Sequence, residues 1–154
     1  MKKKSILFIH HSPSENTKKL SKIVENKIET ITSDVNLKML NLIEANTSSF
    51  KEIDGLIIGT TENFGYMSGL TKDFFDRCYD GLKDETEGLP MIYYVRAGLD
   101  GEGCQVALNK ILIGLRWRQV LPPLILKGSW QEDYLKQLEK FVFTFFNGIE
   151  LGIY

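Results

Sequence analysis

The sequence predicts a doubly wound α/β fold, in which a mostly parallel β-sheet carries helices on both faces. Short apolar runs of strand length alternate along the chain with longer segments whose apolar residues recur at helical spacing. Gly or Pro residues stand beside several of these segments, as expected where strands and helices end. The 154 residues suit a single domain that spans the whole chain, 1–154.

Five segments are predicted to be strands because they are apolar and too short for helices. They are residues 5–10, 35–40, 55–59, 90–95 and 121–126. Pro122 and Pro123 make the start of the last strand irregular, since proline cannot donate to a sheet. Five parallel strands joined by right-handed crossovers suit a three-layer sandwich with the strand order 2-1-3-4-5.

Four amphipathic helices are predicted around these strands. The first begins near Asn16 and Thr17, and the others cover about 68–82, 103–116 and 131–146. A short helical turn is expected at 47–50, and no repeat or low-complexity segment interrupts the pattern.

Composition excludes several classes of function. Nineteen basic and twenty acidic residues give a net charge of −1, without the basic excess of a nucleic-acid-binding protein. No apolar run has the length of a membrane span. The basic start, 1–5, leads into only four apolar residues and no cleavage site, so we predict a core strand rather than a signal peptide and a cytoplasmic protein.

The cysteines and histidines predict no metal site. Cys78 and Cys104 are far apart in the sequence and form no ligand cluster with His10 and His11. Cys104 has no resolving partner nearby, so we interpret it as an ordinary thiol. We assign no catalytic acid or base.

The predicted strand order places a ligand at the carboxyl ends of the strands, near the loops after strands one, three and four. The loop after strand one contains Ser12, Ser14, Asn16 and Thr17 and leads directly into a helix. Such side chains cap a helix, and the same helix start can hold a phosphate. Neither a Walker loop nor a G-x-G-x-x-G fingerprint is present.

The loop after strand three is rich in glycine and contains Phe64 and Tyr66. These rings either tuck under the loop as a small satellite core or stack against a planar ligand. The loop after strand four, 96–103, has small residues and no aromatic side chain.

Two motifs in these loops resemble the flavodoxin-like superfamily, and within it the NAD(P)H-dependent FMN reductases and NAD(P)H:quinone oxidoreductases of the WrbA type. Ser12-x-Ser14-x-Asn16-Thr17 is similar to the phosphate loop of the superfamily. Gly59-Thr60-x-x-x-Phe64-Gly65-x-Met67-Ser68-Gly69 is similar to the segment after the third strand in that branch. The resemblance covers about residues 5–115.

The resemblance implies a flavodoxin-like fold and a site for FMN. It assigns the FMN phosphate to the first loop, the edge of the isoalloxazine ring and the ribityl chain to the second, and the other side of the flavin to the third. The cofactor-binding residues so implied are Ser12, Pro13, Ser14, Asn16, Thr17, Thr61, Glu62, Asn63, Phe64, Gly65, Ala97 and Gly98. Glu15 stands where the superfamily often has glycine, and Thr61-Glu62 replace a Pro-Thr pair. A carboxylate at Glu62 is expected to disfavour anionic reduced flavin and to lower the reduction potential.

Three classes of function remain open. A third loop without aromatics leaves one flavin face free for a nicotinamide, which favours an oxidoreductase that uses NAD(P)H to reduce a quinone or another small acceptor. The alternatives are a flavodoxin-type electron carrier and a flavodoxin-fold binding protein that has lost flavin. Because the site lies at a molecular edge, a homodimer that completes it is also expected.

Overall fold

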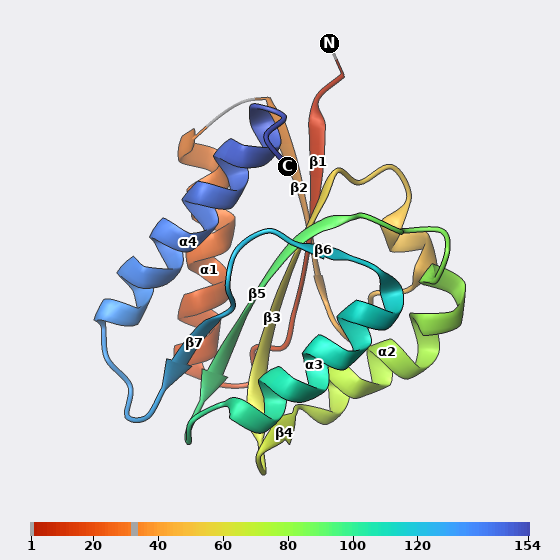
Figure 1. Ribbon diagram of the computed structural model, residues 1–154. Helices are drawn as coiled ribbons and strands as arrows, with labels where there is room; N and C mark the ends of the chain where they lie inside the picture. The colour runs from red at the N-terminus through yellow and green to blue at the C-terminus, as the bar shows by residue number, and fades with distance from the viewer. Residues whose placement is uncertain (1, 32–33) are drawn as a thin grey trace.

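The computed structural model describes residues 2–31 and 34–154 as a sheet with helices on both faces (Figure 1). Met1, the first residue of the basic start, lies outside the described residues. The strands are β1 (Lys4–His10), β2 (Val35–Asn41), β3 (Gly55–Asn63), β4 (Tyr66–Met67), β5 (Pro90–Ala97), β6 (Arg118–Gln119) and β7 (Leu124–Lys127). The helices are α1 (Glu15–Ile31), α2 (Gly69–Leu82), α3 (Glu102–Leu115), α4 (Asp133–Glu150) and the short 3₁₀ helix η1 (Thr47–Phe50).

The strand order is β2-β1-β3-β5, with β6 and β7 both parallel to β5, which confirms the predicted order. Where one fifth strand was predicted at 121–126, the structure has two short strands. The segment between them contains Pro122 and Pro123, whose missing N–H groups cannot join the ladder. The predicted helices are confirmed, and α4 continues to Glu150, four residues beyond its predicted end.

The third strand departs most from its prediction. It extends past Gly59 to Asn63 and then pairs antiparallel with β4, with Glu62 opposite Met67 and Asn63 opposite Tyr66. Most of the predicted second loop is therefore a β-hairpin, whose side chains have fixed directions.

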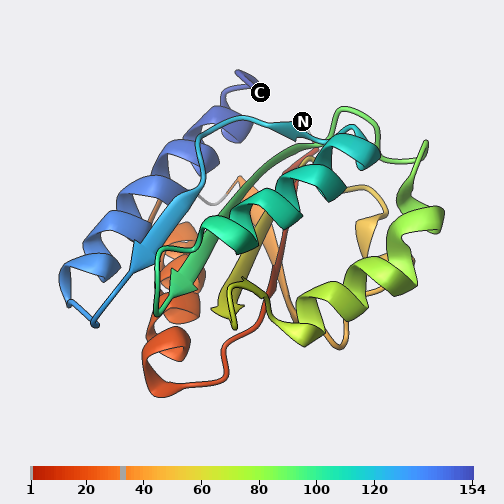
Figure 2. The same cartoon turned by 60° about the horizontal axis from the view of Figure 1, so that its bottom comes forward.

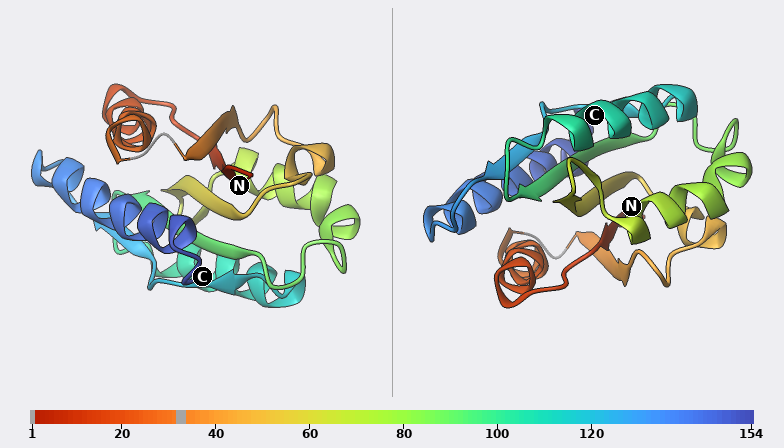
Figure 3. Two further views of the ribbon diagram at one scale, coloured as in Figure 1. Left: turned by 90° about the horizontal axis from the view of Figure 1, so that it is seen from above. Right: turned by 90° about the horizontal axis from the view of Figure 1, so that it is seen from below.

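Helices α1 and α4 cover one face of the sheet, and α2 and α3 cover the other (Figure 3). Alternate residues of β1 show the two layers: Ile6 and Phe8 are buried on the α1/α4 face, Leu7 and Ile9 on the α2/α3 face. Each such side chain contributes about 1.5–3 kcal/mol by leaving water. Strands buried on both faces appear in the sequence as unbroken apolar runs, which is why they were recognisable.

The carboxyl ends of β1, β3, β5 and β7 lie at one edge of the sheet, which Figure 2 turns toward the viewer. The loops that follow these strands gather at this edge. Among the described residues, no helix combines the length and apolar character needed to cross a membrane.

Candidate functional site

The candidate site lies where the strand order reverses, between β1 and β3. The chain leaves β1 toward β2 on one side, whereas β3 leads to β5 on the other. The backbone joins the two strands beyond their ladder, since the His11 N–H donates to the Gly59 carbonyl at 2.9 Å. The predicted first and second loops therefore start side by side.

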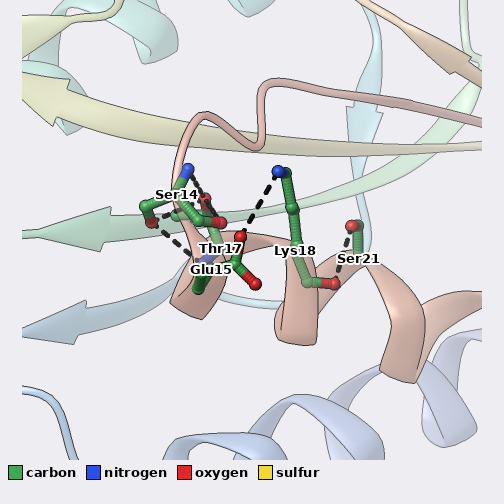
Figure 4. Close-up of polar contacts among 5 residues, drawn as sticks. All are labelled: Ser14, Glu15, Thr17, Lys18 and Ser21. Carbon is green, nitrogen blue, oxygen red and sulfur yellow. Dashed lines mark hydrogen bonds and ion pairs between the residues drawn. The ribbon is translucent and has the colours of Figure 1, made fainter.

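Ser14 precedes the first residue of α1 and caps the helix. Its hydroxyl accepts the Thr17 N–H at 3.2 Å, while Thr17 Oγ1 accepts the Ser14 N–H at 2.8 Å (Figure 4). The two hydroxyl oxygens are also 2.9 Å apart. Two of the four polar residues predicted here thus satisfy each other, and a phosphate would have to share them with the cap.

The remaining residues of this loop leave the helix start open to an anion. The Asn16 side chain is half-buried and makes no hydrogen bond within the described part of the chain, and Pro13 is exposed. The side chain of Glu15 is 90% exposed and pairs with Lys18 at 3.6 Å, so its carboxylate lies outside the loop. Because the first N–H groups of a helix have no intrahelical acceptor, a bound anion would meet free donors here.

A buried histidine lies beneath the first loop. His10 is stacked on Phe8, with ring centroids 4.9 Å apart, and its Nδ1 is 2.8 Å from Ser12 Oγ. Burial lowers the pKa of His10, and it also lowers that of His11. The lowered pKa of each imidazole favours its neutral form, so this loop offers backbone N–H groups and hydroxyls as hydrogen-bond donors rather than histidine cations.

Hydroxyl groups also fix the hairpin that carries the second predicted segment. Thr60 Oγ1 and Ser68 Oγ each lie 2.6 Å from Thr71 Oγ1, and Ser68 caps α2. Thr61 is buried and donates to Asn63 Oδ1 at 2.7 Å. The polar residues of this strand end are thus bonded to one another.

Phe64 and Gly65 form the tip of the hairpin. Both have positive φ, 52° and 73°, as in a type I′ turn. Phe64 is fully exposed and Tyr66 is 42% exposed. The alternative in which both rings form a satellite core is wrong, because the chain covers neither of them completely and leaves Phe64 wholly uncovered.

Glu62 joins the hairpin to the third loop. Its carboxylate accepts the Leu99 N–H at 3.0 Å and the Gly101 N–H at 2.7 Å. The contact is reinforced where the tip meets α3: a Cβ on Gly103 would lie only 1.8 Å from the Gly65 carbonyl oxygen. The predicted second and third loops are therefore held together as one rigid unit, and the hydrogen bonds of Glu62 connect them.

Two predicted residues of the third loop differ in exposure. Ala97 is completely buried, and its carbonyl accepts the Gly128 N–H at 2.9 Å, whereas Gly98 is exposed. Cys104, just beyond the loop, is completely buried, and burial raises its pKa to about 12. The interpretation of Cys104 as an ordinary thiol is consistent with this burial, and the described residues contain no group of His, Cys, Asp or Glu that could hold a metal ion.

Sequence reasoning missed the role of Arg96 at the same edge, where its guanidinium joins the ends of β5 and β7. We call this set of contacts the Arg96 latch. The guanidinium donates to the carbonyls of Leu126 at 3.0 Å and Gly128 at 2.7 Å, and also to that of Ala97 at 2.6 Å. It lies over Trp130, whose ring is also 5.9 Å from the Lys19 ammonium of α1. The sequence feature that could have indicated these contacts is a single arginine at the end of the apolar run of β5.

Comparisons with known proteins agree with this geometry. No family model matches the chain. A flavodoxin from Aquifex aeolicus is 31% identical over 108 residues, 70% of this chain and 57% of that protein, so the chain spans just over half the length of this relative. Flavodoxin 1 from Bacillus cereus superposes with a TM-score of 0.75 at 18% identity, covering 93% of this chain and 97% of that one.

An NADH:FMN oxidoreductase superposes with a TM-score of 0.73 at 20% identity, covering 92% of this chain and 88% of that one. A flavodoxin and an oxidoreductase are thus matched about equally well, and at these identities the similarity establishes the architecture. The chain has the flavodoxin-like fold.

Proposed function

We propose that the chain is a single-domain flavoprotein that binds FMN at this edge and uses NAD(P)H to reduce a quinone or another small acceptor. The observation that carries the proposal is the uncovered Phe64 ring, held on a rigid tip opposite a third loop without aromatics. A planar ring stacked on Phe64 would be covered on that side and open on the other. An open face suits a nicotinamide or a quinone, as in the WrbA-type branch.

In this proposal the protein binds and orients the flavin, which itself supplies the electron chemistry. Ser12, Ser14, Asn16 and Thr17 hold the phosphate at the start of α1, with Pro13 shaping the loop. Residues 61–65 border the ring and the ribityl chain, and the segment of Ala97 and Gly98 borders the other side, where the exposed Gly98 makes the contact and the buried Ala97 supports it. The residues present fit an anion, because Glu15 lies outside the loop and the Asn16 side chain has no protein partner among the described residues.

Glu62 would tune the potential of the bound flavin. Its carboxylate is fixed beside the proposed ring edge by two backbone N–H groups. We expect Glu62→Gln to raise the two-electron midpoint potential by on the order of 20 mV, the equivalent of about 1 kcal/mol. A potentiometric titration measures this, with Glu87→Gln at the opposite edge as the control. An unchanged or lowered potential in Glu62→Gln would contradict the assignment.

Two alternatives have support of their own. The flavodoxin relative favours an electron carrier. The internal bonds of Ser14, Thr17 and Glu62 favour a binding protein that has lost flavin, because the chain already satisfies donors that a flavin would use. For each of the three classes we propose a cytoplasmic protein that does not bind nucleic acid. Its partner is a small molecule or a redox protein, or it binds a small ligand.

The decisive experiment is to record the visible spectrum of the purified protein and then to titrate it with FMN and with riboflavin. We expect FMN to bind at least about tenfold more tightly, because charge-assisted bonds to phosphate are worth about 1.5–3 kcal/mol. Asn16→Ala should reduce the preference for FMN over riboflavin without weakening the helix cap. Asn26→Ala, farther along α1, should leave that preference unchanged. Equal affinity for the two ligands would overturn the phosphate site, and no binding of either would favour the third class.

Turnover then separates enzyme from carrier. Continuous oxidation of NADH or NADPH with a quinone present supports the oxidoreductase. Fast one-electron exchange without nicotinamide turnover supports the carrier and overturns the oxidoreductase.

A further inference from the structure

Helix α3 has an outward face on which several side chains stay exposed. Beyond the contact of Gly103 with the hairpin tip, its exposed positions are Glu102, Val106, Lys110 and Ile113, separated by steps of three and four residues. Such steps place them along one side of the helix. Val106 is 55% exposed and Ile113 is 76% exposed. Single exposed apolar residues are ordinary, but these two are seven residues apart and so lie on one side of α3. Helices α2 and α3 form one outer layer of the molecule (Figure 1).

A groove runs along this face. It has a volume of about 600 Å³, and Tyr66 of β4 and Lys72 of α2 form its far wall. Val106, Ala107 and Ile111 form the apolar wall on α3. The groove therefore has room for side chains from a second element laid against α3.

The charges on this face are arranged symmetrically about Val106. Glu102 stands four residues before it and Lys110 four residues after it, and neither forms an ion pair within residues 2–31 and 34–154. When two copies of such a helix cross antiparallel at Val106, each Glu102 lies opposite the Lys110 of the other copy. An acidic or basic partner would satisfy only one of the two charges, whereas a second copy satisfies both.

We propose that α3 is a dimer interface, on which two copies of this chain pack antiparallel about Val106. Glu102 and Lys110 each lie about 6 Å along the axis from the crossing point, given a rise of 1.5 Å per residue. Helices packed at about 20° lie about 8–10 Å apart, so these side chains can meet across the interface. A two-fold interface needs this self-complementarity. The inference goes beyond the proposed function and does not require FMN, although the interface adjoins the hairpin through Tyr66.

One helix pair is small beside the roughly 800 Å² per partner of a standard interface. We therefore expect a reversible dimer whose population rises with protein concentration and falls with salt. Sedimentation equilibrium of the full chain measures its dissociation constant.

Charge reversal tests the orientation. Glu102→Lys alone and Lys110→Glu alone each place like charges opposite each other twice, and each should weaken the dimer at least about tenfold. The two single variants mixed together, and the double variant Glu102→Lys/Lys110→Glu, restore opposite charges and should dimerise like the original chain. Lys136→Glu on α4 and Glu29→Lys on α1 make the same charge changes at exposed positions away from α3 and should have no effect.

The proposal is wrong if the original chain stays monomeric up to on the order of 1 mM, or if both single reversals dimerise normally. It is also wrong if the mixture fails to recover dimers while circular dichroism shows each variant folded. Both positions are exposed, so the fold is expected to survive.

Discussion

The carboxyl edge of the sheet has two halves that both bond polar groups within the chain but differ in the apolar side chains they leave exposed. In the half around the start of α1, the polar side chains bond within the chain, as Ser14 does to Thr17 and Arg96 to three carbonyls. In the half around the hairpin, Phe64 lies uncovered at a positive φ, and Leu99, whose N–H donates to Glu62, is 69% exposed. We refer to these as the polar half and the hairpin half.

The difference shows which residues serve stability and which do not. Buried polar groups must find partners, so the bonds of the polar half are what folding requires. A bulky residue at positive φ costs of order 1–3 kcal/mol, and an exposed ring gains nothing from burial. Substitutions of the bonded residues in the polar half should therefore lower stability, whereas substitution of the exposed Phe64 should change binding.

The largest effect is expected in the polar half, from Arg96→Met. Methionine keeps the length of the side chain but removes donors to the carbonyls of Leu126 and Gly128. Bonds to a charged donor are worth about 1.5–3 kcal/mol each, and water can replace part of them, so we expect a loss of about 3 kcal/mol. Urea unfolding measures this. Arg118→Met, at an exposed position, should change stability by less than about 0.5 kcal/mol; equal effects at the two sites would remove the role of the latch.

Gly103→Ala tests the rigid contact inside the hairpin half. The new Cβ would meet the Gly65 carbonyl oxygen at 1.8 Å, a backbone atom that can move only with the tip. We expect a loss of about 1–3 kcal/mol, typical of overpacking, and weaker flavin binding. Gly69→Ala on α2, where a Cβ meets nothing within 4 Å, is the matched control and should be neutral or slightly stabilising. A neutral Gly103→Ala would show that the hairpin does not rest on α3.

Phe64→Asn should raise the free energy of unfolding, whereas most substitutions lower it. Asparagine before Gly65 is favoured in a type I′ turn, so the free energy of unfolding should rise by about 0.5–1 kcal/mol. The affinity for FMN should fall about fivefold, since stacking on a ring is worth about 1 kcal/mol. Thermal unfolding and an FMN titration measure the two effects, with Phe143→Ala on α4 as a control for loss of an exposed ring. Unchanged affinity would remove Phe64 from the site.

Much of this architecture could be predicted because its signals are local. Strands such as β1 and β3 are buried on both faces, so their apolar runs were visible, and the order is the one typical of doubly wound folds with five strands. The hairpin could not be predicted in full, because Phe64 at positive φ is an unusual residue for a type I′ turn. Only Pro122 and Pro123 indicated that the fifth strand would be interrupted.

The contacts of the site join residues that are far apart in the sequence, and a short sequence motif does not show such pairs. Glu62 bonds to amides nearly forty residues away, and Arg96 to carbonyls about thirty residues away. The motif around Ser14 and Thr17 indicated both a cap and a phosphate site, and only the geometry shows that the cap is formed. Local patterns therefore locate the loops, while the pairing between loops follows from the fold.

The smallest effect is a pH dependence within the polar half. Burial lowers the pKa of His10, reinforced by His11 and opposed by Glu44 and Glu25. The unfolded chain therefore takes up a proton first as the pH falls below about 6.5, so His10 makes the folded state less stable in acid. We expect the free energy of unfolding of His10→Gln to fall less between pH 7 and pH 5 than that of the original chain. His11→Gln should flatten the curve less, because His11 is only half-buried; equal slopes for all three proteins would mean that His10 is not the buried base of this half.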